Sequence, residues 1–377
     1  MSSVIVGYLR TPFTPAKKGK LAKIRPDDMA ATVVNALIKK TGVDPSLIED
    51  LIVGTAFPEG EQGFNLARMI TFLSDLPETV AGVTINRFCG SSMQAIHDAA
   101  GRISMGAGDV FIAGGVESMT RIPMTGFNPM PNPRLSEEYP EAFTSMGITA
   151  ENLALKHSID RVTQEKFAIE SQTRASTSRE RGAFSEEIVA IETPIGKIDT
   201  DGCIRPRTDS KSLSKLRPAF QANGTVTAGT SSPLTDGAAF VLVCSEEFAN
   251  KNGLKPLARI LSTAVSGCSP DIMGIGPVEA TRKALERAQL SIDDIGVIEL
   301  NEAFAAQSLA VISKLGLDIE KVNIEGGAIA LGHPLGASGA RITGKAAQIM
   351  HKNGEKYALA TMCIGGGQGI ATVLERI

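Results

Sequence analysis

Short runs of β-branched and apolar residues alternate along most of this chain with longer stretches in which apolar residues recur at helical spacing. Runs of the first kind predict buried strands, and stretches of the second kind predict amphipathic helices. Strands are expected at residues 4–7, 50–54, 80–85, 110–113, 239–243, 258–264, 296–300, 321–324, 357–362 and 369–374. Helices are expected at residues 27–41, 90–105, 277–288, 302–315 and 336–352. Because the two kinds of segment alternate, the pattern predicts an α/β fold.

The same order of elements occurs twice. The sequences IEDL at 48–51 and IDDI at 292–295 each follow a predicted helix and lead into a buried strand. The same offset leads from Ile48 to Cys89 and from Ile292 to His333. Each of these two residues precedes a helix of small residues and then a strand that ends in glycines. Matching elements in one order indicate a duplication, and duplicated halves are expected to pack with their loops facing one cleft.

One long segment has no counterpart in the second half. It is rich in Pro, Arg and Ser, and its predicted helices, 150–157 and 163–182, are amphipathic. We therefore expect it to be an inserted domain that lies over the first half. The predicted division is a first half at 1–116 and 224–254, the inserted domain at 117–223 and a second half at 255–377.

Composition narrows the class of protein. The chain has 377 residues, is 43% hydrophobic and carries a net charge of −3, which argues against a nucleic-acid binder. Its five cysteines lack paired spacing, which argues against a disulfide framework and for a reducing compartment. Neither metal-site spacing nor a secretory signal is expected, and the longest apolar runs are too short to span a membrane. We expect a cytoplasmic protein without a metal.

A cysteine stands at one of the predicted strand-to-helix junctions. In TINRFCGSSMQAI, residues 84–96, the spacing places Cys89 in the turn, at the N-terminus of the following helix. Such a helix end favours thiolate, so Cys89 is a candidate nucleophile. The alternative is a buried structural cysteine. A helix terminus contributes only about 0.3 to 1 kcal/mol, whereas one pKa unit requires about 1.4 kcal/mol, so a catalytic Cys89 needs a base from elsewhere in the chain.

The second half supplies a candidate for that base. In GAIALGHPLGASGAR, His333 lies in a glycine-rich turn ahead of a helix, at the position that the repeat matches to Cys89. The other histidines lie within helices or at the end of one, and are expected to be surface or packing residues: His97, His157 and His351.

Two further motifs contain candidate functional residues. In TMCIGGGQG, Cys363 ends a strand, and the glycines after it allow backbone N–H groups to approach a ligand closely. In VIELNEAFAAQ, Asn301 and Glu302 stand at another strand-to-helix junction, where helix capping is an equally suitable role. The remaining cysteines are expected to be structural: Cys203, Cys244 and Cys268.

Together INRFCGSSMQAIHDAA, NEAFA, GGAIALGHPLGASGAR and CIGGGQG resemble the thiolase family, and within it the 3-ketoacyl-CoA thiolase subunits of bacterial β-oxidation complexes. The resemblance spans essentially the whole chain. It implies a five-layered α/β/α/β/α core of two duplicated halves with an inserted loop domain that binds coenzyme A. It also implies a homodimer and, as a possible partner, a hydratase and dehydrogenase subunit.

The resemblance assigns roles to residues of this chain. Cys89 is similar to the family nucleophile, His333 to the base, and Cys363 to the acid and base that acts on the departing enolate or the incoming CoA. Asn301 resembles the residue that positions a water in a first oxyanion hole, and the backbone N–H groups of Cys89 and Gly365 would form the second. Ser232 and Met146 resemble residues that line the CoA tunnel.

The segment 195–220 is locally basic, with six positive against three negative side chains. A solvated loop and the rim of an anionic-ligand site are both compatible with this charge. If the segment is such a rim, its candidate contacts to CoA are Arg205, Lys215 and Arg217. CoA would then be a substrate, and no other cofactor is expected.

The implied reaction is thiolytic cleavage of a 3-ketoacyl-CoA to acetyl-CoA and a shortened acyl-CoA. The alternatives are a biosynthetic acetoacetyl-CoA thiolase, a condensing enzyme of fatty-acid synthesis and a non-catalytic acyl-CoA carrier. Ser145, and Ser92 with Met93, depart from the pattern of many biosynthetic thiolases and favour the degradative branch. A carrier would be expected to lose Cys89, His333 or Cys363, and all three are present.

Overall fold

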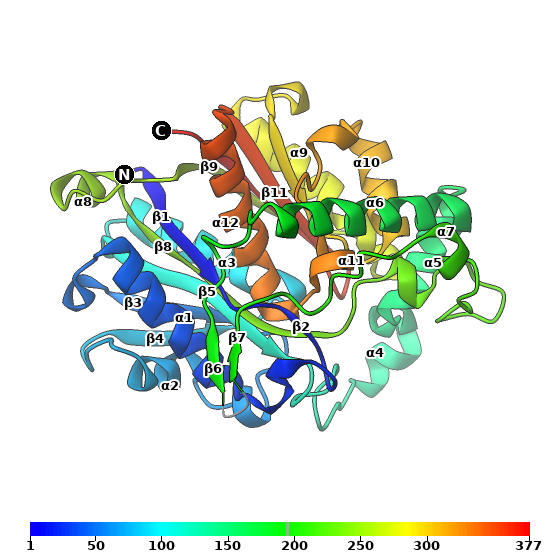
Figure 1. Cartoon of the computed structure of the whole chain (residues 1–377), viewed down its shortest axis with the longest axis horizontal. Helices are drawn as coiled ribbons and strands as arrows, with labels where there is room; N and C mark the ends of the chain where they lie inside the picture. The colour runs from blue at the N-terminus through cyan, green and yellow to red at the C-terminus, as the bar shows by residue number, and fades with distance from the viewer. Residues whose placement is uncertain (194–195) are drawn as a thin grey trace.

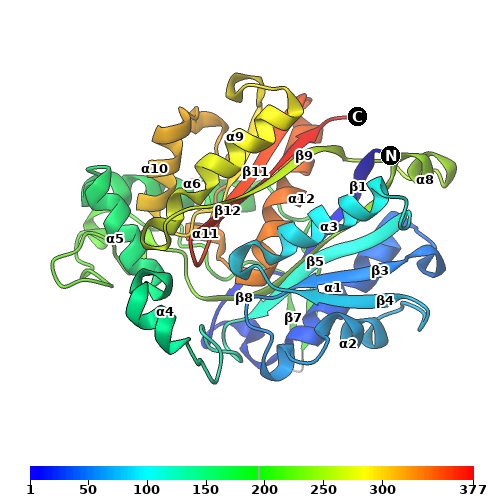
Figure 2. The same cartoon turned by 180° about the vertical axis from the view of Figure 1, so that it is seen from behind.

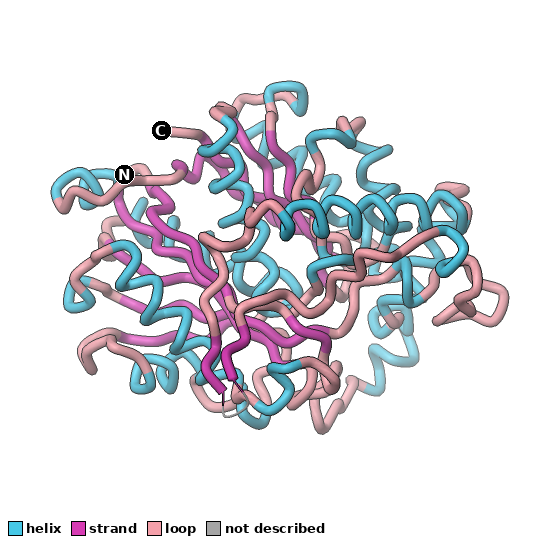
Figure 3. Tube along the Cα trace, viewed as in Figure 1, coloured by secondary structure: helices cyan, strands magenta, loops and turns pink. Residues whose placement is uncertain are grey.

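The strands of both halves lie in one twisted sheet. The computed structural model describes residues 1–193 and 196–377; Ile195, where the basic segment begins, lies outside these residues. In the first half the strand order is β4 (Ala81–Ile85), β3 (Asp50–Gly54), β5 (Val110–Ser118), β8 (Thr235–Ser245) and β1 (Ser3–Arg10). In the second half it continues with β9 (Ala258–Gly267), β12 (Gln368–Glu375), β11 (Tyr357–Ile364) and β10 (Val297–Leu300). Figure 3 shows the strands in magenta with helices in cyan around them. The short strand β2 (Thr14–Pro15) pairs with β8.

The two half-sheets have the same topology. In the first half β3 is parallel to β5, β5 is antiparallel to β8, and β8 is antiparallel to β1. In the second half β10 is parallel to β11, β11 is antiparallel to β12, and β12 is antiparallel to β9. The halves meet where β1 and β9 pair, and only two residue pairs join them there. The duplication predicted from the sequence is therefore confirmed.

Five layers are visible in Figures 1 and 2. The central layer consists of α3 (Ser91–Ser104) and α12 (Leu335–Asn353), which pack on each other and on both half-sheets. The outer layer of the first half contains α1 (Pro26–Thr41) and α2 (Leu66–Leu73). The outer layer of the second half contains α9 (Gly276–Ala288) and α10 (Ala305–Leu315). The predicted α/β/α/β/α architecture is confirmed.

The central helices require small residues at their crossing. A Cβ atom added at Gly339 of α12 would lie 2.4 Å from the backbone nitrogen of Met93 in α3. A Cβ atom added at Gly336 would lie 2.7 Å from Cα of Thr55, just beyond β3. Since neither backbone can move without disturbing a buried strand or helix, these positions admit glycine alone. The small residues after His333 therefore allow the start of α12 to lie against the first half.

Between β5 and β8 the chain leaves the sheet and forms a separate set of helices. They are α4 (Pro133–Glu138), α5 (Met146–Lys156), α6 (Arg161–Glu180) and α7 (Ser210–Leu213), with a hairpin of β6 (Ile191–Thr193) and β7 (Gly196–Ile198). We expected this region to lie over the first half. That prediction was wrong for α5 and α6, which pack against α10 and α11 (Ala328–Leu331) of the second half. Buried apolar side chains on α6 and α10 explain the contact.

Two other predictions need correction. Residues 321–324 form no strand, because only Val322 pairs with β10, in a single bridge to Ile298. The helix expected from residue 302 begins at Ala305. Several short elements were not predicted, among them α2 and α8 (Glu246–Lys251). In the described part of the chain, no helix is both long enough and apolar enough to cross a membrane.

Candidate active site

Cys89 lies in the tight turn Phe88–Gly90, between β4 and α3. Phe88 has a φ of +43°, which turns the chain sharply at the residue before the cysteine. The Cys89 side chain is buried, with 9% exposed, and its turn packs against α12 and β11. The backbone N–H of Gly365 and the N–H of Cys89 itself lie near Sγ and lower the pKa of the thiol. Two residues far apart in the sequence thus place N–H donors at the same sulfur.

The surroundings keep Cys89 protonated at rest. Burial raises the pKa of its thiol to about 11, and the negative charge of Glu117 acts in the same direction. The N–H groups near the sulfur oppose this shift but are outweighed. The helix end alone therefore does not produce a thiolate, and Cys89 needs a base before it can attack a carbonyl.

His333 can act as that base because its tautomer is determined by its neighbours. Ser338 Oγ donates its proton to the carbonyl oxygen of Pro334 at 2.9 Å, so it accepts from His333 Nδ1 at 2.6 Å. The lone pair is therefore on Nε2, which lies 3.3 Å from Asn301 Nδ2. Burial, followed by the charge of Arg341, lowers the pKa of His333 to about 3. The imidazole is neutral at pH 7 and can accept a proton.

Asn301 is fully buried at the end of β10. Its Nδ2 donates to His333 Nε2, and its Oδ1 has no protein partner among the described residues. The alternative that it caps a helix is wrong, because α10 begins at Ala305 with Phe304 before it. An unpaired buried oxygen beside the histidine is a suitable position for an ordered water.

Glu302 does not cap the helix either. Its carboxylate accepts hydrogen bonds from Ser171 Oγ of α6 at 2.6 Å and from Asn323 Nδ2 at 2.8 Å. It also accepts a hydrogen bond from the backbone N–H of Ile329 in α11. This short helix ends at Leu331, and the glycine-rich turn with His333 follows it. Glu302 thus ties α6 to the segment that leads into His333.

Cys363 is the next-to-last residue of β11 and is 1% exposed. Burial, followed by the proximity of Cys89, raises the pKa of its thiol well above the usual value. It belongs to an apolar cluster with Phe304 and with Met146, the first residue of α5. Met146 Sδ lies 3.5 Å from the position of a Cβ atom added at Gly365. The structure thus brings Cys89, Cys363, Gly365 and Met146 together.

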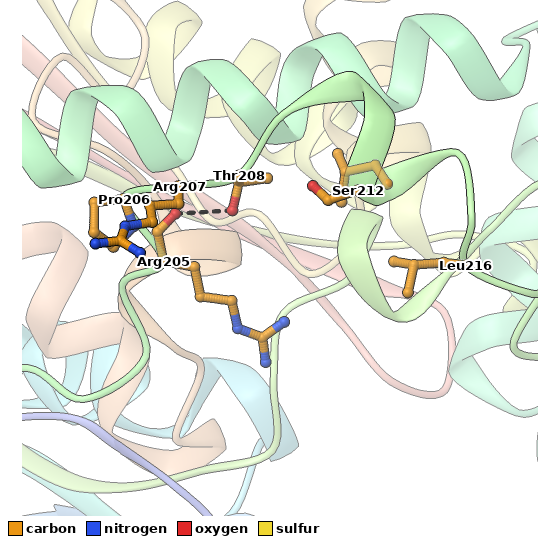
Figure 4. Close-up of a pocket in the computed structure, with 7 residues that line it drawn as sticks. Arg205, Pro206, Arg207, Thr208, Ser212 and Leu216 are labelled. Atoms are coloured by element: carbon orange, nitrogen blue, oxygen red, sulfur yellow. Dashed lines mark hydrogen bonds between the residues drawn. The ribbon is translucent and has the colours of Figure 1, made fainter.

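Only some of the residues predicted to contact CoA line a cavity or lie near the Met146 cluster. Arg205 lines an open cavity of about 490 Å³ together with Arg207 and Thr208 on one side and Ser212 and Leu216 on the other, as Figure 4 shows. A smaller neighbouring cavity extends from Arg205 to the residues next to Ser232. The Ser232 N–H donates to the Ala303 carbonyl, which places it beside the Met146 cluster. Lys215 and Arg217 are exposed and line neither cavity.

Sequence reasoning missed two buried residues of the site, Ser338 and Glu117. Ser338 stands five residues after His333 in the same motif, in the first turn of α12, so its place in GHPLGAS could have identified it. Glu117 follows the glycines of FIAGG, and its contacts depend on the pairing of the two halves.

Among the described residues, no group of His, Cys, Asp or Glu side chains could hold a metal ion.

Comparison with known proteins agrees with this geometry. The thiolase N-terminal domain model matches residues 3–247, and the thiolase C-terminal domain model matches residues 254–376. A 3-ketoacyl-CoA thiolase of Bacillus subtilis (strain 168) is 47% identical, and one of Pseudoalteromonas translucida (strain TAC 125) is 50% identical. These alignments cover 99% of this chain and 99% and 98% of the relatives. The crystal structure of human mitochondrial 3-ketoacyl-CoA thiolase superposes with a TM-score of 0.92 at 39% identity, covering 100% of this chain and 98% of that one. The chain therefore belongs to the thiolase family.

Proposed function

We propose that Cys89, His333 and Cys363 cleave a 3-ketoacyl-CoA by a ping-pong acyl-cysteine route. The activity is that of a 3-ketoacyl-CoA thiolase, an acetyl-CoA C-acyltransferase of fatty-acid β-oxidation, in line with relatives that are 47% and 50% identical over nearly their full length. The observation that best supports the route is the pair of N–H groups, from Gly365 and Cys89, at the Cys89 sulfur.

In the first half-reaction His333 Nε2 takes the proton from Cys89 Sγ, and the sulfur forms a bond to C3 of the substrate. The C2–C3 bond then breaks, and its electron pair leaves on C2 of acetyl-CoA. Cys363 donates its thiol proton to that carbon. Because Cys363 has a pKa well above the usual value, it retains this proton until the carbanion forms.

In the second half-reaction the Cys363 thiolate takes the proton of an incoming CoA thiol. The CoA sulfur attacks the acyl group on Cys89, the acyl–sulfur bond breaks, and Cys89 recovers its proton from His333. Every proton is returned, so the enzyme is ready for another turnover. Two thiols are needed because Cys89 holds the acyl group while Cys363 transfers protons.

Two sets of donors stabilise the negative oxygens that form. The N–H groups of Cys89 and Gly365 form one oxyanion hole, consistent with their position near the sulfur. His333 and a water bound by Asn301 form the other, and the unpaired Oδ1 of Asn301 suits that water. Each such donor is typically worth about 10² to 10³ in rate.

Coenzyme A enters as a substrate along the inserted region. We propose that Arg205, supported by Lys215 and Arg217, binds its phosphates, and that Ser232 and Met146 contact its pantetheine arm. The cavity at Arg205 and the position of Met146 beside Gly365 support this path. The division into halves at 1–116 with 224–254 and at 255–377, and a loop domain at 117–223, belongs to the same proposal.

A homodimer is the proposed assembly. Strand β4 is one of the two end strands of the sheet, and beside it α2 exposes Met69, Phe72 and Leu73. An exposed strand edge flanked by apolar side chains favours pairing with a second copy. Light scattering of wild type and Phe72→Asp tests this, since loss of the dimer is expected in the variant alone.

Membership of a β-oxidation complex with a hydratase and dehydrogenase subunit is a further proposal, based on the motifs. Co-purification of that subunit with the tagged chain would test it. A cytoplasmic location is proposed because all five cysteines are free thiols.

The decisive experiment traps the acyl-enzyme. Purified protein is incubated with a long-chain 3-ketoacyl-CoA in the absence of CoA, and the adduct is mapped by peptide mass spectrometry. An acyl group two carbons shorter than the substrate is expected on Cys89 and absent from Cys203, an internal control that is also a buried free thiol. His333→Ala should suppress the adduct. Unmodified Cys89 with intact bound substrate would instead favour an acyl-CoA carrier.

A further inference from the structure

Glu117 is a buried carboxylate that the reaction above does not use. It lies near the end of β5 and is 1% exposed. Oε2 accepts hydrogen bonds from the backbone N–H groups of Ala56 and Gly336, each at 2.8 Å. Oε1 accepts from Gln62 Nε2 at 2.6 Å and from Thr55 Oγ1 at 3.2 Å.

Burial raises the pKa of the Glu117 carboxyl, and the four hydrogen bonds oppose that shift and favour the ionised form. Two of the donors are backbone N–H groups and one is an amide NH₂, and none of these three can accept a hydrogen bond. A carboxylate also suits the N-terminus of α12, where Gly336 is the second residue. Hence a negative charge is held between the two halves of the molecule.

Hydrogen bonds lead from this carboxylate to both reactive turns. On one side Gly336 stands three residues after His333. On the other side the Ala56 carbonyl accepts from Asn86 Nδ2 at 3.0 Å, and Asn86 Oδ1 accepts from the N–H of Phe88 at 2.7 Å. Phe88 directly precedes Cys89 in its turn. Glu117 therefore stands at the junction between the turn of the nucleophile and the turn of the base.

The charge of Glu117 also acts on Cys89 itself, where it favours thiol over thiolate. The ionisable groups next to Cys89 in its surrounding elements are Cys363 of β11, His333 before α12 and Arg87 in the adjoining backbone. Farther along these elements, α12 carries Arg341 and Lys345, which pair with buried carboxylates, and α3 carries His97. Cys363 and His333 are neutral at pH 7, because burial raises the pKa of the thiol and lowers that of the imidazole. The Arg87 guanidinium is directed at Gln94 and Gln368.

We propose that Glu117 is a positioning residue of the thiolase reaction. It holds the His333 turn against the Cys89 turn through its hydrogen bonds to Ala56 and Gly336, and its negative charge lies on the side of the nucleophile. This inference rests on the proposed function for its effect on turnover. Its effect on Cys89 is independent of turnover and can be measured separately.

The test is the pH dependence of Cys89 alkylation by iodoacetamide, with the modified peptide quantified by mass spectrometry. Glu117→Gln preserves the shape but removes the charge, so the midpoint of the alkylation profile should fall by about 1 pH unit. Its kcat should fall by about 10²-fold because the two turns are no longer held in register. The KM for CoA should not change, since Glu117 does not line the Arg205 cavity.

Asp236→Asn is the matched control. Asp236 is also a fully buried carboxylate, and it accepts hydrogen bonds from Ser118 and Thr120 beside the same strand. Asp236 is not among the groups that shift the pKa of Cys89. The alkylation midpoint of this variant should remain at the wild-type value.

Glu117→Asp distinguishes the effect of the charge from that of the hydrogen bonds, and it replaces Glu117→Gln as the test if that variant does not fold. It keeps the charge, but its shorter side chain cannot reach both Ala56 and Gly336, so kcat should fall while the alkylation midpoint stays unchanged. A wild-type midpoint in Glu117→Gln, or wild-type turnover in Glu117→Asp, would overturn the proposal. Failure of the acyl-trapping experiment would overturn the proposed function and leave the alkylation profile intact.

Discussion

Ser338 Oγ accepts the Nδ1 proton of His333 at 2.6 Å while donating its own proton to the Pro334 carbonyl. Because the hydroxyl proton is already engaged, the serine can only accept from the imidazole. The lone pair of His333 is thereby directed from Nε2 toward Asn301. A single hydroxyl, one helical turn into α12, determines which nitrogen can act as the base.

Ser338→Ala should slow the enzyme without weakening substrate binding. The variant leaves a buried N–H donor without a partner, at a cost of about 1 to 3 kcal/mol, and it allows the imidazole to adopt the other tautomer. We expect kcat to fall by about 10-fold or more and KM for CoA to stay the same. Steady-state kinetics would check this. Ser214→Ala, which removes an exposed serine hydroxyl on α7's C-terminal side, is the control.

The pH profile of kcat/KM tests the protonation state of His333. Because the pKa of His333 is lowered to about 3, the base is neutral throughout the physiological range, and wild type should show no acid limb down to about pH 5. Asn301→Asp places a carboxylate at Nε2, which raises the pKa of the imidazole. An acid limb should then appear below about pH 7.

Asn301→Ala is the uncharged comparison for that profile. It removes the group that orients the water, so kcat should fall by about 10² to 10³, but no acid limb should appear. The same profile for Asn301→Asp as for wild type would mean that residue 301 does not act on His333.

The sequence predicts the repeat and the residues with reactive side chains, because both depend on local patterns. Cys89 and His333 follow from one offset in two halves, and most core strands follow from short apolar runs. Contacts that depend on the packing of the halves were not predictable in the same way. Glu302 shows this: its position suits a helix cap, but Ser171, more than a hundred residues away, determines its role.

A predicted strand in the second half shows the same limit of prediction from sequence. Residues 321–324 have strand-like composition, yet Val322 alone pairs with β10. The equivalent position in the first half is the five-residue strand β4. Strand formation here depends on whether a neighbouring backbone is available over several residues, and composition does not report that.

Ser171→Ala should destabilise the protein more than its small change in volume suggests. Ser171 Oγ donates to Glu302 and accepts from the Gly327 N–H at 3.2 Å, so its loss leaves a buried carboxylate oxygen and an N–H short of partners. The expected cost is about 1 to 3 kcal/mol in the free energy of unfolding, measured by urea denaturation. Ser185→Ala, which removes an exposed local hydrogen bond, should cost much less; equal losses would contradict the role given to Ser171.

His97 should make the protein less stable in mild acid. Its pKa is lowered to about 3 by burial and then by Arg87 and Arg287, against 6.5 in the unfolded chain. Between these values the unfolded chain binds a proton that the folded chain does not, so stability falls as pH falls through this window. The contribution approaches about 1.4 kcal/mol per pH unit.

His97→Gln removes that contribution and should flatten the dependence of unfolding free energy on pH between about 6.5 and 3. Glu299, whose pKa is raised to about 7, acts in the opposite sense but is present in both proteins and cancels in the comparison. His351→Gln, at an exposed position, should leave the slope unchanged. The same slope in wild type and His97→Gln would show that His97 is protonated in the folded protein.

Arg205→Ala tests the path proposed for coenzyme A. Arg205 lines both the open cavity and the smaller one that leads toward Ser231, whereas Arg207 lines the open cavity alone, so Arg205 is the residue that the proposed path assigns to a phosphate. Loss of a charge-assisted hydrogen bond costs about 1.5 to 3 kcal/mol, so KM for CoA should rise by about 10-fold or more. Because the guanidinium lies away from the reacting sulfurs, kcat should be unchanged.

A phosphate-free acceptor separates this role from a general effect on the fold. With pantetheine in place of CoA, wild type and Arg205→Ala should have the same KM, since the acceptor offers no phosphate to bind. Lys215→Ala, which removes a positive charge outside both cavities, should raise KM for CoA less than Arg205→Ala does. If the loss were equal with both acceptors, Arg205 would act on the shape of the cavity, and the phosphate site would have to lie elsewhere along the basic segment.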